Sequence, residues 1–164
     1  SCFLNLPVLE EAMKKHSLDK LMNRLSLALL LGTAAFLIVY WRRIPEEVPM
    51  HFNAAGEIDR WSPKSGLIIL PVITWMLYGL LTVVEKILGT WNTGVKCARE
   101  NWAQIYILLG HLISTQKLLF MAMFAGIILC CALTLPLPVW FTPVMPGLVF
   151  LDMAYWIVRL IRAK

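Results

Sequence analysis

Four long apolar stretches, separated by polar segments, dominate the pattern of positions along the chain. They cover residues 25–41, 66–84, 118–135 and 139–158. A helix needs roughly 20 apolar residues to cross the hydrocarbon core of a bilayer, and Asp152 is the only charged residue within any of the four. The pattern predicts an all-α integral membrane protein, with four transmembrane helices in an antiparallel bundle that forms one membrane domain over residues 1–164.

A further helix is predicted directly before the third stretch. Within residues 101–117 the apolar positions recur at helical spacing, with Gln104, His111 and Thr115 on the opposite face. This amphipathic helix either continues straight into the third stretch as one long helix or lies in the membrane interface. The preceding residues Trp91–Gly94 are predicted to form a turn.

Proline positions shape the last part of the bundle. The Pro136–Pro138 link is long enough only for an antiparallel pair of helices. Pro143 and the Pro146-Gly147 pair are expected to interrupt the last helix one turn inside its end and to kink it, because proline lacks a backbone donor.

Composition supports lipid as the solvent of the chain. It is 59% hydrophobic and 15% charged, whereas soluble domains average about 45–50% apolar and about 25% charged residues. The first stretch is predicted to be a retained helix rather than a signal peptide, since its long basic flank contains Glu10, Glu11 and Asp19. The sequence begins at Ser1 rather than Met, so we expect either a trimmed N-terminus or a fragment of a longer chain.

The distribution of basic residues predicts how the chain is oriented. With four crossings, both termini and residues 85–117 share one side, which holds 11 of the 15 Lys and Arg residues. The positive-inside rule puts this side in the cytoplasm of a multi-pass cell-membrane protein and residues 42–65 on the outer face. The net charge of +5 follows from this bias. The bilayer itself is the expected partner, and no nucleic-acid partner is needed.

The segment between the first two stretches, IPEEVPMHFNAAGEIDRWSPKS, is predicted to fold as a small hairpin. Its Pro residues disfavour helix at the preceding positions. Alternation places His51 and Asn53 on one face and Met50 and Phe52 on the other. Asn53–Gly56 is typical of a turn, after which the chain would return antiparallel. Ser62-Pro63 would start the second helix, with serine as N-cap and proline at the first helical position.

This segment, residues 44–65, resembles the signature of the bacterial membrane family known as domain of unknown function 1648. The matching residues are Pro45, Pro49, His51, Phe52, Asn53, Gly56, Asp59 and Lys64. Pro63 departs from the pattern, which more often has Gly-Ser-Lys there. The resemblance implies a bacterial inner-membrane protein. The candidates for ligand binding are Pro49, His51, Phe52, Asn53, Gly56, Asp59 and Lys64. A related branch includes immunity proteins against a sporulation-delaying toxin, which have further helices after the same motif that we do not expect in this chain.

Two hypotheses compete for His51. With Asn53, Glu57 and Asp59 nearby it could bind a metal or act as an acid or base. A zinc site, however, usually needs three or four strong ligands, and only His51 is one. The favoured interpretation is that His51 bonds a carbonyl or Asp59 and that Asn53 caps the turn, with no metal and no cofactor.

Asp152 is the second candidate position, because an intramembrane carboxylate is costly and marks a functional or polar-network site. The favoured interpretation is that it snorkels or bonds a neighbour, and the alternative is a proton or ion relay. The partners considered for it are Arg159, Thr33, Thr74 and Thr82. His111 is predicted to be solvated, and Glu85-Lys86 is predicted to be a solvated pair at the interface.

No motif of a familiar membrane enzyme is present in the sequence. The leading hypothesis is a non-enzymatic membrane protein with an outward loop that recognises an envelope ligand, such as a toxin, an antimicrobial peptide or a partner protein. The loop would present His51, Asn53, Glu57, Asp59 and Arg60. One alternative is a small transporter or channel subunit that uses Asp152 and the Pro146-Gly147 break. The other is a metal-assisted hydrolase centred on His51.

Overall fold

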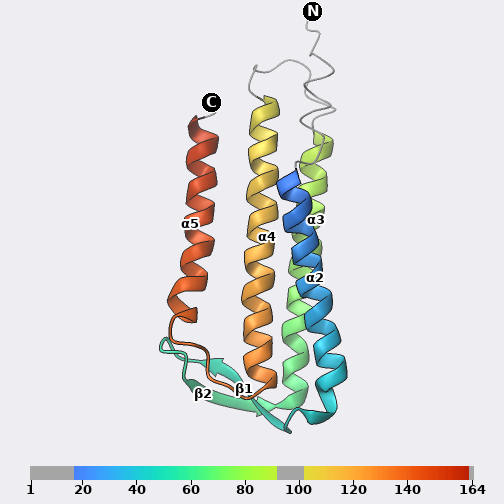
Figure 1. The fold of residues 1–164 in the computed structure, drawn as a ribbon, viewed down its shortest axis with the longest axis vertical. Coiled ribbons are helices and arrows are strands. Elements are labelled where there is room, and N and C mark those ends of the chain that lie inside the picture. The colour runs from blue at the N-terminus through green and yellow to red at the C-terminus, as the bar shows by residue number, and fades with distance from the viewer. Residues whose placement is uncertain (1–16, 92–101, 163–164) are drawn as a thin grey trace, which may run out of the picture.

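The computed structural model describes residues 17–91 and 102–162, and it confirms the all-α membrane fold. Within these residues four helices are long and apolar enough to cross a bilayer. They are α2 (Ser17–Tyr40), α3 (Ile69–Trp91), α4 (Trp102–Ala132) and α5 (Phe141–Arg162). They run alternately up and down, so both termini lie at one end of the bundle and the segment between α2 and α3 lies at the other (Figure 1).

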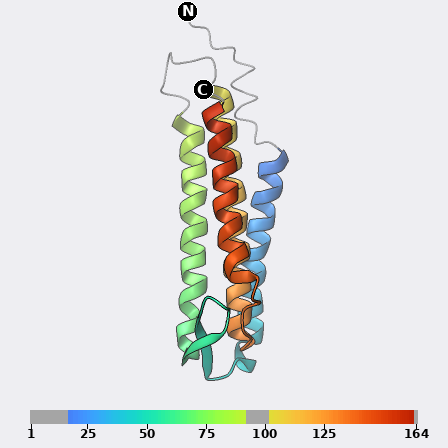
Figure 2. The same ribbon diagram turned by 90° about the vertical axis from the view of Figure 1, so that its left-hand side faces the viewer.

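Helix α4 is the centre of the bundle. It packs against α2, α3 and α5, whereas α2 and α3 have few contacts with each other. Figure 2, turned by 90°, shows α5 in front of α4 with α2 and α3 on either side. Most of the described side chains of α4 are therefore buried or half-buried, although Gln104 and Leu129 remain exposed.

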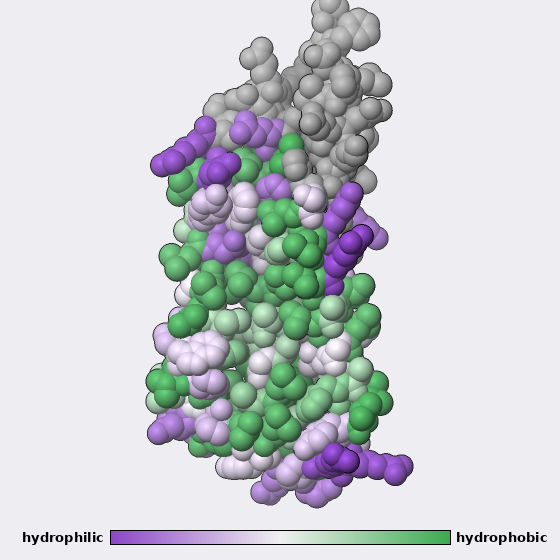
Figure 3. Space-filling view, in the orientation of Figure 1, coloured by the Kyte–Doolittle hydropathy of each residue, from purple (hydrophilic) through white to green (hydrophobic). Residues whose placement is uncertain are grey.

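The outer surface of the bundle is apolar in the middle and polar at the ends. Large side chains such as Ile38, Val39 and Leu151 are 78%, 82% and 69% exposed. A broad hydrophobic band covers the middle of the molecule, with hydrophilic residues above and below it (Figure 3). A soluble protein would hide such a surface, but lipid is as apolar as these side chains, and the arrangement fits a transmembrane bundle.

A two-stranded antiparallel sheet closes the end of the bundle opposite the termini. Strand β1 (Glu47–Phe52) pairs with β2 (Ile58–Pro63), and short 3-10 helices η1 (Trp41–Arg43) and η2 (Lys64–Ile68) join the sheet to α2 and α3. The predicted hairpin is confirmed. Its apolar side chains Met50 and Phe52 pack on a buried cluster at the ends of the helices, while His51 is exposed.

The predicted start of the second helix at Ser62-Pro63 is wrong. Ser62 lies in β2 opposite Val48, and the helical segment begins at Lys64 without a side-chain cap. The cause is the strand pairing, which continues one residue further: the backbone N–H of Lys64 donates to the carbonyl of Glu46 at 2.7 Å. Proline has no backbone N–H group. It is tolerated at the end of β2, because no hydrogen bond to the neighbouring strand is needed from that position.

The amphipathic segment and the third apolar stretch form one helix. The 31 residues of α4 correspond to about 46 Å of helix, which confirms the straight continuation rather than a separate interfacial helix. Trp91 ends α3, and residues 92–94 of the predicted turn lie outside the described residues.

The other helices also depart from the predicted boundaries. Helix α2 begins at Ser17, eight residues before the apolar stretch, and α3 continues to Trp91 beyond residue 84. Helix α5 is continuous across Pro146, so the predicted interruption is wrong. Pro143 stands in the first turn of α5, where the backbone N–H of a residue has no intrahelical partner to lose.

Candidate functional site

Asn53 builds the turn of the hairpin. Its side-chain oxygen accepts hydrogen bonds from the backbone N–H groups of Ala55 and Glu57, each at 2.9 Å. Its side-chain nitrogen donates to the Glu57 carboxylate at 2.8 Å. These bonds fix the backbone from residue 53 to residue 57, and they confirm the prediction that Asn53 caps the turn.

Gly56 attaches this turn to the rest of the protein. Its φ is +83°, a conformation that side chains disfavour. Its carbonyl accepts a hydrogen bond from the backbone N–H of Leu137 at 2.9 Å, and a Cβ atom here would lie 2.4 Å from the Leu137 carbonyl oxygen. The hairpin tip is therefore held against the link between α4 and α5, a contact that no local sequence signal indicates.

His51 pairs with Asp59 across the hairpin. The His51 Nδ1 lies 2.5 Å from the Asp59 Oδ1, and the two side chains are 61% and 43% exposed. The favoured interpretation, a hydrogen bond to Asp59, is confirmed. No group of three or more His, Cys, Asp or Glu side chains within residues 17–91 and 102–162 is arranged to hold a metal ion.

The remaining motif residues stabilise the fold. Pro49 is fully buried and Phe52 packs on the core cluster below the sheet. The Lys64 ammonium lies over the ring of Trp41, 5.0 Å from its centroid. Between residues 51 and 61 the exposed charged and aromatic side chains form a set that we call the hairpin surface: His51, Glu57, Asp59, Arg60 and Trp61.

A second group of polar residues lies between the helices. The Lys117 ammonium of α4 is 2.7 Å from the Glu85 carboxylate of α3 and donates to the Asn23 side-chain oxygen of α2 at 2.8 Å. Asn23 in turn donates to Glu85 at 2.8 Å. The Lys117 and Glu85 side chains are 1% and 7% exposed. The prediction that Glu85 is solvated is wrong, because Lys117 draws it into the bundle.

One turn closer to the termini, Asp19 joins α2 to α4. Its Oδ1 lies 2.7 Å from the His111 Nδ1 and accepts a hydrogen bond from the Ser114 hydroxyl at 2.7 Å. The His111 and Asp19 side chains are 13% and 8% exposed. The prediction that His111 is solvated is therefore wrong. In a membrane bundle the polar face of an amphipathic helix can turn toward its neighbours, with lipid on the other side.

Asp152 of α5 completes the network. It accepts hydrogen bonds from the Thr115 hydroxyl at 2.8 Å, from the Gln116 amide at 3.0 Å and from the Trp156 indole N–H at 3.0 Å. The favoured interpretation, a bonded carboxylate, is supported.

The partners predicted for Asp152 are wrong. Arg159 donates to the Tyr155 hydroxyl, and the three threonines donate to carbonyls of their own helices. A threonine in a helix interior readily makes that local bond four residues back.

The depth of the network in the bundle follows from the helix lengths. Glu85 is 16 residues beyond the start of α3, and Lys117 is 15 residues before the end of α4. At 1.5 Å per residue, both lie about 22–24 Å from the hairpin end of their helices, within a hydrocarbon core of about 30 Å. Asp19 and His111 are each 21 residues from that end, about 32 Å away, at the edge of such a core. We call these contacts of Asp19, Asn23, Glu85, His111, Ser114, Thr115, Gln116, Lys117, Asp152 and Trp156 the intramembrane network.

The arrangement of charge in the intramembrane network follows the architecture. Asp19, Glu85 and Asp152 come from the three outer helices, one from each, while Lys117 and His111 come from the central α4. Lys117 therefore does not belong to the membrane surface. Of the eleven basic residues that the sequence assigns to the side of the termini, ten remain. The bias in basic residues between the two sides survives this correction.

Part of the chain is similar to a known family. Residues 28–75 match the family described as "Domain of unknown function (DUF1648)". An "Uncharacterized protein" of Archaeoglobus fulgidus is 29% identical over 68 residues, which are 42% of this chain and 37% of that protein. The match therefore spans just over a third of the length of the relative. No solved structure shows a significant match. The matched residues 28–75 hold the second half of α2, the whole hairpin and the start of α3, so this part of the chain is similar to the DUF1648 family.

Proposed function

We propose that the protein is a non-enzymatic membrane protein that recognises a peptide or protein ligand with its hairpin surface on the outer face of the membrane. The observation that carries this proposal is a rigid hairpin whose buried residues fix it to the bundle while its charged and aromatic residues remain exposed. The proposed sidedness follows from the excess of basic residues at the end that holds the termini.

Rigidity is the first argument for a recognition surface. The Asn53 turn, the contact between Gly56 and Leu137 and the packing of Phe52 hold the hairpin in one position. A surface that is ordered before binding loses little conformational entropy when a ligand arrives. Such a platform is more useful for binding than a mobile loop of the same composition.

The chemistry of the hairpin surface indicates the class of ligand. Glu57 and Asp59 supply carboxylates, Arg60 supplies one cation, and the Trp61 ring is 51% exposed. Carboxylates beside an exposed aromatic ring fit a ligand with cationic and apolar side chains. A cationic amphipathic peptide, such as a toxin or an antimicrobial peptide, has this chemistry. We therefore propose an immunity-like role at the envelope of a bacterial cell.

Replacement of Trp61 by Ala is expected to weaken peptide binding or toxin protection at least about tenfold, because central aromatic residues dominate binding energy at interfaces. Sensitivity to cationic peptide toxins is compared in cells that lack the gene, carry it, or carry the variant. Trp75→Ala is the matched control, since Trp75 is a half-exposed tryptophan of α3 on the lipid-facing surface. Equal protection by Trp61→Ala and by the unaltered protein would contradict the proposal.

A small transporter or channel subunit is the second candidate function. The intramembrane network favours it, because ionisable groups inside a membrane commonly serve ion or proton pathways. Proton and sodium flux into vesicles that contain the purified protein would be measured with and without Asp152→Asn. For a transporter, the substitution abolishes a flux that the unaltered protein supports.

If the protein serves only recognition, neither the unaltered protein nor the Asp152→Asn variant is expected to support flux. Asp152→Asn then costs only about 1–3 kcal/mol of stability, because an amide offers one oxygen to the three donors that now share a carboxylate. Chemical unfolding in detergent micelles checks this cost. Asp59→Asn on the exposed hairpin is the control, with an expected change of less than about 1 kcal/mol.

A further inference from the structure

We propose that the groove between α2 and the start of α3 binds one acyl chain of an anionic phospholipid, with the phosphate of that lipid at Lys64. This site is separate from the hairpin surface, and the inference goes beyond the recognition function. It rests on three observations. The groove is apolar and opens sideways, unpaired cations lie at one end of it, and its length suits part of an acyl chain.

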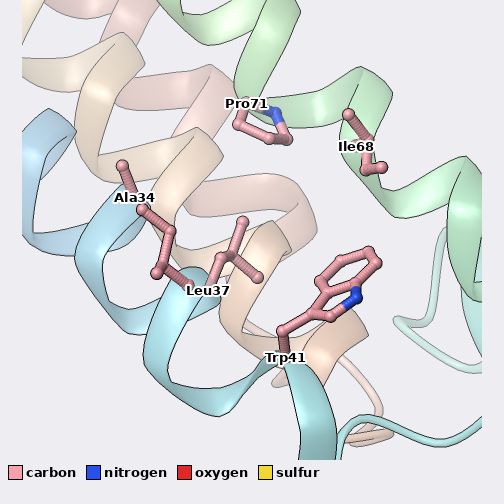
Figure 4. Close-up of a pocket in the computed structure, with 6 residues that line it drawn as sticks. Ala34, Leu37, Trp41, Ile68 and Pro71 are labelled. Carbon is pink, nitrogen blue, oxygen red and sulfur yellow. The ribbon is translucent and has the colours of Figure 1, made fainter.

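The groove is almost wholly apolar. It has a volume of about 430 Å³ and is lined by Ala34, Leu37, Ile38, Trp41, Ile68 and Pro71. Figure 4 shows Ala34, Leu37 and Trp41 on one side, with Ile68 and Pro71 facing them from the other. The groove exists because α2 and α3 each pack on α4 and barely touch each other, and because Ala34 is small. In a bilayer its open side faces lipid, as the 78% exposed Ile38 indicates.

The hairpin end of the groove is cationic. The Lys64 ammonium lies over the ring of Trp41, which itself lines the groove, so the charge stands at the mouth. Arg42 and Arg43 directly follow Trp41 in η1. Within the part of the chain that the structure describes, none of these three cations forms an ion pair with a carboxylate. The nearby Glu46 contributes its backbone carbonyl to the Lys64 N–H.

The dimensions and charge together indicate the occupant. Ala34 of α2 and Trp41 of η1 are seven residues apart along the chain, so the groove continues about 10 Å from its charged mouth into the hydrocarbon layer. A ligand that fits this groove therefore has a negatively charged group at the membrane interface and a thin apolar chain that extends from it into the groove. An anionic phospholipid has this form. A second copy of the chain would bring its own cations to the mouth, which like-charge repulsion opposes.

Native mass spectrometry of the purified full chain tests the site. The protein in detergent is titrated with phosphatidylglycerol or with phosphatidylcholine of the same acyl chains, and the fraction with one bound lipid is measured. Phosphatidylglycerol is expected to bind about tenfold more tightly, since both lipids carry the phosphate but the choline ammonium of phosphatidylcholine offsets its charge and is repelled by the cations at the mouth. Lys64→Gln is expected to remove this difference, and Ala34→Phe to reduce the binding of both lipids by filling the groove.

Two controls make the result decisive. Arg60→Gln makes the same change of charge on β2, away from the groove lining, and is expected to keep the preference. Glycerol 3-phosphate, which carries the phosphate without chains, is expected not to compete. Equal binding of the two lipids, an unchanged preference in Lys64→Gln, or loss of the preference in Arg60→Gln would overturn the proposal. Competition by glycerol 3-phosphate would show a free-phosphate site instead and would equally overturn it.

Discussion

Replacement of Lys117 by methionine is expected to lower the free energy of unfolding by about 3–5 kcal/mol, the cost of removing one partner of a buried ion pair. Lys117 is 1% exposed, and its ammonium contacts both Glu85 and Asn23 inside the bundle. Methionine fills a similar volume, so the loss arises from the Glu85 carboxylate, which keeps its burial and loses its cation. Equilibrium unfolding in mixed detergent micelles measures the change.

A double substitution separates charge from packing in this experiment. Lys117→Met combined with Glu85→Gln removes both charges, so most of the lost stability is expected to return. The interaction between the two substitutions is then several times larger than the roughly 0.5 kcal/mol seen for independent sites. A single variant as stable as the unaltered protein, or two substitutions whose effects simply add, would show that the pair does not hold α3 to α4.

Replacement of Gly56 by alanine is expected to destabilise the protein by at least about 2 kcal/mol, because a side chain at positive φ is strained. The new Cβ would also lie 2.4 Å from the Leu137 carbonyl oxygen, so the turn must move away from the link between α4 and α5. Hydrogen exchange is expected to accelerate at the backbone N–H groups of the hairpin turn and of Leu137. Unfolding in micelles gives the change in stability.

Gly66→Ala is the matched control for this variant. Gly66 belongs to η2 next to the hairpin, and a Cβ there meets only the Ser62 Cβ at 3.9 Å. Its stability is expected to stay within about 0.5 kcal/mol of the unaltered protein. If the Gly56 and Gly66 variants behave alike, then the contact of the hairpin with Leu137 contributes nothing to the stability of the fold.

The elements that local chemistry determines could be predicted from the sequence. The apolar stretches predict four helices because lipid imposes a minimum length on each. The hairpin follows from residues that act on their own neighbours: Asn53 bonds the backbone of Glu57, and Gly56 adopts positive φ. The pairing of His51 with Asp59, eight residues apart across a short turn, is within the same reach.

The intramembrane network could not be predicted, because its partners are distant in the sequence. Asp19 bonds His111, 92 residues away, and Asn23 bonds Lys117, 94 residues away. The expectation that polar residues beside an apolar stretch are solvated misassigned Glu85 and His111. One signal was present: Ser114–Lys117 is polar yet lies within an unbroken helical pattern that continues into an apolar stretch. Such residues must either leave the membrane or meet partners inside the bundle.

The groove at Lys64 could not be predicted from the sequence either. Its lining comes from the end of α2, from η1, from η2 and from the start of α3, and its existence depends on how the helices pack on α4. The family motif contains Lys64 but does not indicate that its ammonium lies over Trp41.

Cysteine labelling of the hairpin tests the orientation of the protein most directly. Glu57→Cys is placed in a background in which Cys2, Cys97, Cys130 and Cys131 are replaced by serine, and Arg162→Cys at the end of α5 is its counterpart. A membrane-impermeant maleimide is expected to modify position 57 in intact cells and position 162 only after lysis. Modification of position 162 in intact cells, with position 57 protected until lysis, would contradict a hairpin that faces outward.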